Sequence, residues 1–381
     1  MTPRAHYRHA GFSLIDLMIG MVIGIFALLA VALVFRNFAA ERNTNIGTLE
    51  SQSNGTMALY LLERDLGQAG YAMAKLQNCP FISYYYNGST FNATPLPGNM
   101  AGSGAYALST LPVRIITNNS GSDTLEIQYG NPASGVAGSE ITSPVTYPGA
   151  YPITSAIGFN QGDLAVADIS NQCTLIAVTN NTSPVLSPIA HDGTNPLYNV
   201  AAAPGGAGWN NVDAAALAAN PVPYLANLGA FVSRRYTTSL TNGLYALRAA
   251  DFPAYGANSV VDEIVFLKAQ YGLSATASSY AVTGWVDGNT AIDNTTASRV
   301  VAIRIGVLAR SPLTEKAPVN APSMFSILPP ISGNSTMGAP ALGQCGTDPG
   351  TMEVQCSVPD THFRYRAYST IVPLKNVIWS R

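Results

Sequence analysis

A single acidic residue stands at the start of a long apolar segment near the N-terminus of this 381-residue chain. Asp16 is followed by residues 17–35, which contain no charged side chain. A lone carboxylate in an apolar environment is costly and usually functional, because its charge must be matched by a cationic group. We therefore expect Asp16 to need a cationic partner.

Four cysteines could form disulfide bonds. None belongs to a C-x-x-C pair, which argues against a zinc or thioredoxin-like site, and an even number in a chain with an export segment is typical of disulfides. Cys345 and Cys356 bracket a short loop that contains Gly and Pro, so we expect them to pair and Cys79 to pair with Cys173. Two or more free buried thiols are the alternative.

Acid–base and metal chemistry have little support in the sequence. His191 in a loop and His362 at a strand start are interpreted as surface histidines, not as a catalytic dyad. Gly102–Ala107 mimics a dinucleotide fingerprint without a strand–helix–strand frame, and Asp287–Asp293 lacks the Gly and Glu of a calcium loop. We interpret these as a flexible loop and a turn, and predict no catalytic residue, no metal and no cofactor.

The composition suits an extracytoplasmic protein. Charged residues make up 10% of the chain and the formal net charge is -2, whereas about 25% charged residues is usual. This balance argues against a nucleic-acid-binding protein, which would normally show a basic patch. The length allows two or three domain-sized units or one large β-rich unit.

Residues 17–35 are long enough to cross a membrane, since a helix of that length spans about 28 Å. Arg4 and Arg8 precede the segment and should stay in the cytoplasm, which would place the rest of the chain outside. A cleaved signal peptide is one interpretation, because Ala30–Ala32 has the small-x-small form, but the apolar run continues past that site. An uncleaved signal anchor is another, but it gives Asp16 no role.

A third interpretation rests on a resemblance. The run Gly-Phe-Ser-Leu-Ile-Asp-Leu-Met at residues 11–18 resembles the class III signal of type IV prepilins and type II secretion pseudopilins. The resemblance implies that prepilin peptidase cuts between Gly11 and Phe12 and methylates the new amine of Phe12, so that residues 1–11 are a leader peptide. It also implies that Asp16 forms an assembly salt bridge with the N-terminal ammonium of a neighbouring subunit. The usual acid is Glu, so with the shorter Asp16 the contacts could be weaker or shifted, or only the Phe12 amine could be needed.

The apolar spacing predicts one long helix from about Phe12 to about Leu66, ending near Gly67 or Gly70, because no proline interrupts it. Asn54-Gly55 could mark a kink. We expect residues 12–35 to form the transmembrane or filament-core part of a helical region that spans 12–70, and the second half to pack an apolar stripe against a globular domain. The stripe consists of Phe38, Ile46, Leu49, Met57, Leu61, Leu62 and Leu66.

Residues 71–381 are predicted to form a mainly antiparallel β-sheet domain in the periplasm, with loop insertions at 80–110 and 180–225. Short β-type runs alternate with Gly, Asn, Pro and Ser, and few helices intervene. The fold class is therefore α+β and pilin-like, with a short helix at Ala214–Ala219. The expected strands are Val113–Thr117, Thr124–Tyr129, Leu164–Ile169, Thr174–Val178, Phe231–Tyr236, Leu244–Arg248, Glu263–Ala269, Val300–Ala309 and His362–Ile371.

Two groups of aromatic residues are of interest. Tyr84–Tyr86 is a candidate interface, because exposed aromatic residues anchor contacts, and partial burial under a loop is the alternative. Phe363, Tyr365 and Tyr368 are expected to form one packed face of a strand.

Four segments together resemble the PilW family of minor pilins: Leu61–Tyr71, Val261–Gly272, Val300–Ser311 and Phe363–Asn376. The resemblance implies a non-enzymatic minor pilin that helps to initiate type IV pilus assembly and sits at or near the pilus tip. It implies prepilin peptidase, other minor pilins, the major pilin, inner-membrane lipid before assembly and, as a candidate, a tip adhesin as partners, with no nucleic acid. The chain would be a single-pass inner-membrane protein before it enters the pilus.

Two alternatives remain open at the level of sequence. A minor pseudopilin of a type II secretion system shares part of the pattern, although such proteins of the J type are generally shorter. A membrane-anchored periplasmic binding protein or enzyme is the alternative from a different class. The N-terminus of the mature protein and the genomic neighbours would separate these possibilities.

Overall fold

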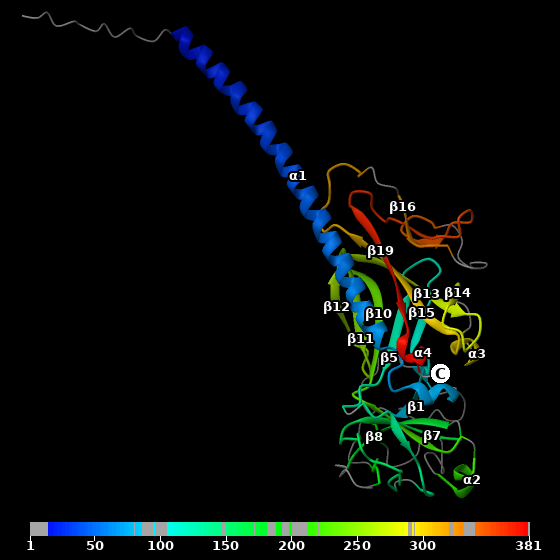
Figure 1. Ribbon diagram of the computed structural model, residues 1–381. Coiled ribbons are helices and arrows are strands. Elements are labelled where there is room, and N and C mark those ends of the chain that lie inside the picture. The colour runs from blue at the N-terminus through cyan, green and yellow to red at the C-terminus, as the bar shows by residue number, and fades with distance from the viewer. Residues whose placement is uncertain are drawn as a thin grey trace, which may run out of the picture.

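The computed structural model describes residues 14–79, 81–85, 94–95, 105–133, 135–146, 149–170, 172–180, 188–192, 198–199, 212–219, 221–288, 292, 294–319, 323–330 and 340–379. A long N-terminal helix projects from a β-rich body (Figure 1). The body has a core unit, in which a five-stranded and a four-stranded sheet pack with the helix, and a distal unit around a seven-stranded sheet. This is the α+β, mainly antiparallel fold that the sequence predicts.

Helix α1 (Leu14–Gln68) is continuous over 55 residues. It has no break at Asn54 and Gly55, the position at which the sequence suggested a kink. The chain leaves the helix at Gly70, whose φ of +79 is a left-handed conformation that glycine adopts without steric cost. The Gly70 N–H donates to the carbonyl oxygen of Gln128 at 2.9 Å, which fixes the helix end to the body. The predicted single long helix and its end are therefore confirmed.

The core unit contains two antiparallel sheets. The order in the five-stranded sheet is β12-β11-β10-β5-β4, and in the four-stranded sheet it is β14-β13-β15-β19. Their inner faces and the second half of α1 enclose the largest apolar core among the described residues. The strands are β4 (Val113–Ile116), β5 (Thr124–Tyr129), β10 (Val232–Thr241), β11 (Leu244–Asp251), β12 (Ala257–Asp262), β13 (Ile264–Ser274), β14 (Val282–Asp287), β15 (Val300–Arg310) and β19 (Tyr365–Pro373).

Strand β15 is buried along its whole length because both of its faces are covered. Ile303, Ile305 and Val307 face the core shared with α1, whereas Leu308 belongs to a second core under a small three-stranded sheet. A Cβ atom at Gly306 would lie 2.4 Å from the side chain of Ile327, so glycine is required for this close approach. The alternation of side chains along the strand thus serves two cores at once.

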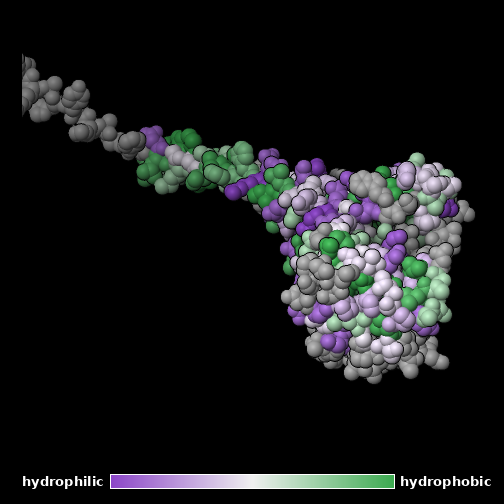
Figure 2. All heavy atoms as spheres, turned by 60° about the horizontal axis from the view of Figure 1, so that its bottom comes forward, coloured by the Kyte–Doolittle hydropathy of each residue, from purple (hydrophilic) through white to green (hydrophobic). Residues whose placement is uncertain are grey.

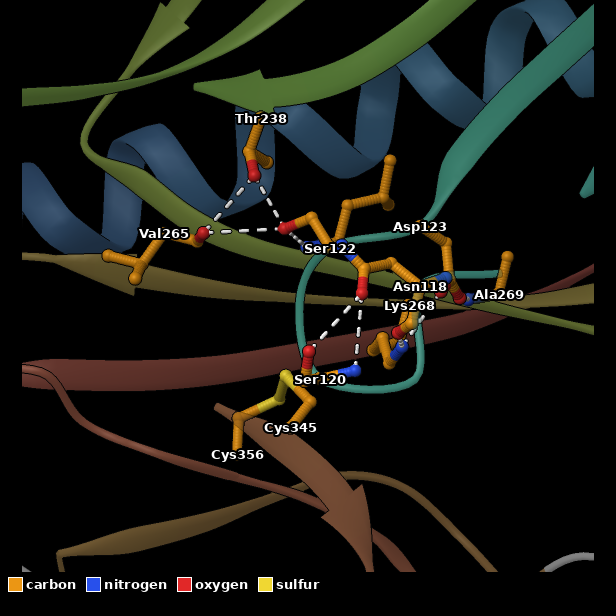
Figure 3. Close-up of a disulfide and its surroundings, with 11 residues drawn as sticks. Asn118, Ser120, Ser122, Asp123, Thr238, Val265, Lys268, Ala269, Cys345 and Cys356 are labelled. Atoms are coloured by element: carbon orange, nitrogen blue, oxygen red, sulfur yellow. Dashed lines mark hydrogen bonds and ion pairs between the residues drawn. A yellow bond between two sulfur atoms is a disulfide. The ribbon is translucent and has the colours of Figure 1, made fainter. Parts of the chain in front are cut away.

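The three-stranded sheet has the order β16-β18-β17 and consists of β16 (Met324–Leu328), β17 (Cys345–Thr347) and β18 (Val354–Ser357). A disulfide joins Cys345 to Cys356, which lie opposite each other in the β17–β18 ladder. The Cys345 N–H donates to the carbonyl of Ser120 at 3.1 Å, so the disulfide lies next to the turn between β4 and β5 (Figure 3).

A buried ion pair holds the other end of that turn. Lys268 Nζ lies 2.7 Å from Asp123 Oδ1, and both side chains are almost fully buried. The remaining hydrogen bonds to Asp123 come from the backbone N–H groups of Asn118 and Ala269, at 3.0 Å each. A buried ion pair is tolerated only when its remaining hydrogen-bonding capacity is satisfied, and these backbone donors meet that condition (Figure 3).

The distal unit lies beyond the C-terminal end of α1, away from the free half of the helix (Figure 1). Its sheet has the order β2-β3-β1-β8-β7-β9-β6. Among the described strand pairs of this sheet, only β1–β8 is parallel. The helical segments are η1 (Ala74–Asn78) and α2 (Ala214–Leu217), and short helices α3 (Asn294–Ala297) and α4 (Lys375–Trp379) belong to the core unit. The strands are β1 (Ile82–Tyr85), β2 (Thr94–Pro95), β3 (Ala105–Leu108), β6 (Gly138–Glu140), β7 (Leu164–Ile169), β8 (Gln172–Ala177) and β9 (Tyr224–Gly229).

Two apolar cores cover opposite faces of the distal sheet, which explains why every residue of β7 is buried. Ala165 and Ala167 face one core and Leu164 and Val166 face the other. A disulfide between Cys79 and Cys173 joins the end of η1 to β8. Both disulfides are the pairs expected from the sequence.

The nine expected strands correspond to β4, β5, β7, β8, β10, β11, β13, β15 and β19, and the short helix expected at Ala214–Ala219 is α2. The expectation of loop insertions is wrong in part. Within 80–110 the chain forms β1, β2 and β3, and within 180–225 it forms the start of β9 in addition to the expected α2. These strands are short and lack regular alternation, so the period-2 signal does not reveal them.

Several local expectations are corrected by the structure. Residues 105–107 of the expected flexible loop belong to β3, whereas residues 102–104 lie outside the described residues. Tyr84 is fully buried in β1, so it is not an exposed interface residue; Tyr86 lies outside the described residues. Asp287 ends β14, where its carboxylate accepts a hydrogen bond from Gln270 at 2.9 Å.

The C-terminal aromatic residues do not share one face. Tyr365 is buried in the core under the three-stranded sheet, and Phe363 packs against the same core. Tyr368 instead packs on the core that α1 covers. Residues three apart in a strand point to opposite sides, so Tyr365 and Tyr368 serve different cores.

His191 is buried in the distal unit and is not a surface histidine. Its ring stacks on Tyr151 with centroids 4.4 Å apart and planes at 6°. Burial lowers the pKa of His191 from its ordinary value of 6.5 to about 4, although the neighbouring Asp192 carboxylate acts in the opposite direction. The folded protein therefore keeps this imidazole neutral at pH values where the unfolded chain protonates it.

We expect this histidine to make stability depend on pH. Between pH 6.5 and about 4 the unfolded chain binds a proton at His191 that the folded chain does not, so the free energy of unfolding should fall by about 3 kcal/mol as the pH is lowered. Denaturant unfolding of the full chain in detergent micelles measures this. His191→Phe keeps the stacked ring and should flatten the pH profile in this window; equal slopes in both proteins would contradict the assignment.

Candidate assembly interface

The N-terminal half of α1 is an uncovered apolar surface. Leu14–Arg36 is long and apolar enough to cross a membrane, and none of its most apolar stretch is buried. Leu14, Phe26 and Phe35 expose 75%, 67% and 70% of their surface, although side chains of this kind are normally buried. Figure 2 shows this half as a largely apolar rod that projects from a body whose surface mixes hydrophilic and hydrophobic residues. Such a surface needs lipid or another apolar surface to cover it.

Asp16 lies in the first turn of α1 and is exposed. An acid near a helix N-terminus is favoured by the helix dipole, but in an apolar environment it also needs a cationic partner. The residues of the predicted cleavage and methylation site, Gly11 and Phe12, lie outside the described residues. A Cβ atom at Gly20 or at Gly24 would meet no other atom within 4 Å, so this part of the helix is open to close contact.

The middle of α1 packs on the body through small residues. Gly47, Ser51, Gly55 and Ala58 are buried at intervals of three or four residues, which places them on one face. A Cβ atom at Gly55 would lie 2.3 Å from two ring carbons of Tyr368 on β19. Glycine at this position therefore serves a close approach between the helix backbone and an aromatic ring, not a kink.

The predicted apolar stripe is correct only in its last part. Leu62 and Leu66 are fully buried in the main core, and Ile46 and Leu61 are half-buried. Phe38, Leu49 and Met57 were also expected to pack on the body, but they are exposed by 64%, 65% and 47%. They face outward because the small residues take the packed face, and the helical period alone did not show which face is covered.

A buried acid fixes α1 to the five-stranded sheet. Asp65 is fully buried between Leu62 and Leu66. Its carboxylate accepts a hydrogen bond from the Tyr236 hydroxyl at 2.7 Å and forms ion pairs with Arg234 and Arg64 at 3.0 Å each. Because two cations and a phenol satisfy its oxygens, this acid can remain in the apolar interface.

The same cluster perturbs its partners. Burial, followed by the hydrogen bond to Asp65, raises the pKa of Tyr236 well above its ordinary value. Hydrogen bonding to Asp251 raises the pKa of Arg234, whose Nε lies 2.5 Å from that carboxylate. The tyrosine therefore stays neutral and the arginine stays charged over the whole physiological range.

Three further contacts secure the helix. Asn376 Nδ2 donates to the carbonyl oxygens of Gln68 and Ala69 at 3.1 Å and 3.4 Å, which satisfies acceptors that every helix end leaves open. The Thr370 hydroxyl donates to Glu63 at 2.6 Å, and the Thr44 hydroxyl donates to Glu315 at 3.3 Å. These contacts span the packed half of α1.

Sequence reasoning missed the side chains that hold the helix, namely Arg234, Tyr236, Tyr368 and Asn376. By sequence, Asp65 forms a charged patch with Glu63 and Arg64. Its position between two leucines of the apolar stripe was the available signal, because an acid at a core-facing position implies a buried partner. Nothing local to residues 234 or 376 indicates their role, since the contacts join positions more than 160 residues apart in sequence.

The remaining candidate sites show no catalytic arrangement among the described residues. His362 is half-buried and its ring lies 3.0 Å from Asp360. Cys79, Asp168 and Cys173 lie close enough to share a metal ion, but both cysteines are bonded to each other and offer no thiolate.

Comparison with known protein families finds a match for the C-terminal part of the chain. Residues 231–376 match the family PilW, described as Type IV Pilus-assembly protein W. The match starts just before β10 and ends within α4, so it includes Arg234, Tyr236, Tyr368 and Asn376 and excludes the distal sheet. No curated protein and no solved structure matches the chain significantly.

The close approach at Gly55 predicts that a larger side chain at this position destabilises the protein. Gly55→Ala should lower the free energy of unfolding by about 1–3 kcal/mol, because its methyl group overlaps the Tyr368 ring. Gly67→Ala is the matched control: it lies on the same helix with no atom within 4 Å of its Cβ position, so it should leave stability unchanged or raise it by up to about 1 kcal/mol. Denaturant unfolding of the full chain in detergent measures both.

A third variant separates the clash from a general effect of helix composition. In a Tyr368→Ala background the ring is gone, so Gly55→Ala should no longer destabilise the protein. A loss of equal size with and without the ring would show that the assigned contact is not the cause.

Proposed function

The chain is a PilW-family type IV pilus protein, and from this premise we propose that it is a minor pilin that helps to initiate pilus assembly. The observation that supports this proposal is the uncovered apolar half of α1. The body holds it in a fixed position, and it begins with a single acid. PilW is a pilus-assembly family and not a known enzyme family. The match favours a pilus over a type II secretion system.

Before assembly, the apolar half would cross the inner membrane once. Residues 1–11 would be the leader in the cytoplasm, residues 12–35 would span the bilayer at the start of the helical region 12–70, and residues 71–381 would form the periplasmic domain. Arg4 and Arg8 support this orientation, since basic residues stay on the cytoplasmic side. Prepilin peptidase would then cut after Gly11 and methylate the amine of Phe12.

During assembly the apolar half would leave the lipid and pack among the helices of neighbouring pilins. Asp16 would meet the Phe12 ammonium of a neighbour there, and each charge would offset the cost of burying the other. The pair would also fix the axial offset between the two helices. The partners would be other minor pilins and the major pilin.

The distal unit supports a place at or near the pilus tip. It lies at the end of the body that is opposite to the free half of α1 (Figure 1). A subunit with such an extension is most easily accommodated where no further subunit packs beyond it, and a tip adhesin could bind there. Labelling of the distal unit on sheared pili should mark filament ends, and even labelling along the shaft would contradict a tip position.

We expect the mature protein to begin at Phe12. N-terminal sequencing or mass spectrometry of the membrane-bound protein should find N-methyl-phenylalanine, and Gly11→Leu should leave the leader attached. A start after Ala32 would indicate an ordinary signal peptide, and an intact Met1 would indicate a plain anchor.

We also expect Asp16 to be needed for assembly. Asp16→Asn keeps the size of the side chain and removes its charge, so a buried ammonium loses its partner and incorporation into pili should fall about tenfold or more. Asp16→Glu restores the charge and should assemble at least as well as the wild type. Immunoblots of sheared pili against the membrane fraction measure this, and normal incorporation of the Asn variant would refute the role assigned to Asp16.

A further inference from the structure

A groove of about 530 Å³ runs between the packed half of α1 and the edge of the five-stranded sheet. On the sheet side it is bordered by β12, which is an edge strand, and by the start of β11. Its described lining residues are Glu50, Asn54 and Met57 on α1, with Leu244, residues 260–263 and Pro312 on the other side.

The groove has both apolar and polar lining residues, and its apolar side chains are exposed. Met57, Leu244 and Val260 expose 47%, 63% and 39% of their surface, although their neighbour Val261 is buried in the main core. Several large apolar side chains that remain exposed around one concave surface are typical of a contact site for another molecule.

The rim of the groove is acidic. Glu50 and Asp262 are exposed, and the described lining residues include no Lys or Arg. The third acid, Glu263, is buried and lies 2.7 Å from Arg310 Nε, so its charge is already matched. Two carboxylates therefore face the space that an occupant would fill, and they favour a cationic occupant over an anionic one such as a lipid phosphate.

The groove also continues the apolar half of α1. Ile25, in the apolar half, is exposed by 58% and lies 25 residues before Glu50. Twenty-five residues are about seven helical turns, so Ile25 and Glu50 share one side of α1. A neighbour that packs along the apolar half would reach the groove if it followed this side of the helix.

We propose that the groove receives the α1 helix of a second pilus subunit, at the basic segment that directly follows its apolar half. This chain shows the required chemistry: Arg36 and Arg42 are exposed on its own α1, and with one acid, Glu41, residues 36–49 keep a net charge of +1. A parallel helix displaced by eight residues, or about 12 Å, would bring residue 42 to the level of Glu50. The Asp16–Phe12 pair would set an offset of about four residues, so the helix in the groove would belong to a different neighbour from the one whose Phe12 meets Asp16. The proposal rests on the proposed function and names a charged contact with this second neighbour.

Photo-crosslinking in piliated cells tests the proposal. A photoreactive phenylalanine analogue replaces Leu244 at the groove, Tyr280 as an exposed site in the β13–β14 connection, and Leu28 in the apolar half, each in the full chain. The analogue at Leu244 should link to a second pilus subunit within the dozen residues after its apolar segment, as identified by mass spectrometry of the linked peptides. The analogue at Tyr280 should give no such link.

Charge variants test the recognition. Glu50→Lys with Asp262→Lys should lower the crosslink yield at Leu244 about tenfold, because like charges then oppose each other across the groove. Glu50→Asp with Asp262→Glu keeps both charges and should preserve the yield. Neither pair touches Asp16 or the buried Asp65 cluster, so links from Leu28 should be unchanged.

The outcomes separate this proposal from the function on which it rests. Links from Leu28 to pilin helices without links from Leu244, or links from Leu244 to a globular domain, overturn the groove assignment and leave the pilin assignment standing. A yield at Leu244 that is insensitive to charge reversal also overturns it. If neither Leu28 nor Leu244 links to a pilus subunit and the chain is absent from pili, the proposed function itself fails.

Discussion

The architecture depends on the close contact between the middle of α1 and the four-stranded sheet. Because Gly55 has no side chain, the ring of Tyr368 can lie against the helix backbone, and Gly47 likewise approaches Ser311, with a Cβ position 3.2 Å from that side chain. Small residues on a helix allow short interaxial distances and many dispersion contacts. The buried Asp65 cluster then fixes the helix along its axis. With the second half held in this way, the apolar first half cannot fold back on the body and stays available to lipid or to other helices.

The core unit and the distal unit differ in how they are stabilised. The core unit buries charged pairs, such as Lys268 with Asp123 and Arg310 with Glu263, at distances of 2.7 Å each. Removing one partner of such a pair leaves an unmatched buried charge, so these pairs define the packing geometry more than they add stability. The distal unit instead has two apolar cores on one sheet and a disulfide at Cys79–Cys173. The PilW match covers most of the core unit, so the parts of the chain that hold α1 are also the parts that are shared with the family.

Sequence pattern predicted the features that depend on local order. The length of α1, nine of the strands and the fold class follow from periodicity, and β15 has the clearest alternation. The same reasoning failed where tertiary packing decides. Phe38, Leu49 and Met57 are apolar and in helical register, but the packed face belongs to glycine, serine and alanine, which hydrophobicity does not mark. A polar loop predicts a surface position for His191, and only the stacked Tyr151 forty residues away explains its burial.

The distribution of positive charge limits what each end of the molecule can bind. Residues 115–233, which include most of the distal unit, contain no Lys or Arg. A polyanion such as nucleic acid or an anionic lipid surface needs cationic side chains for affinity, so residues 115–233 are unsuited to either. On α1, by contrast, Arg36 and Arg42 follow the apolar half at the height where a membrane surface or an acidic groove would meet them. The two arginines can satisfy phosphate groups before assembly and carboxylates afterwards. In the proposed assembly, the transfer from bilayer to filament would exchange one set of anionic partners for another and would leave no cation buried alone, as the proposed Asp16 pair would for the charges within the apolar layer.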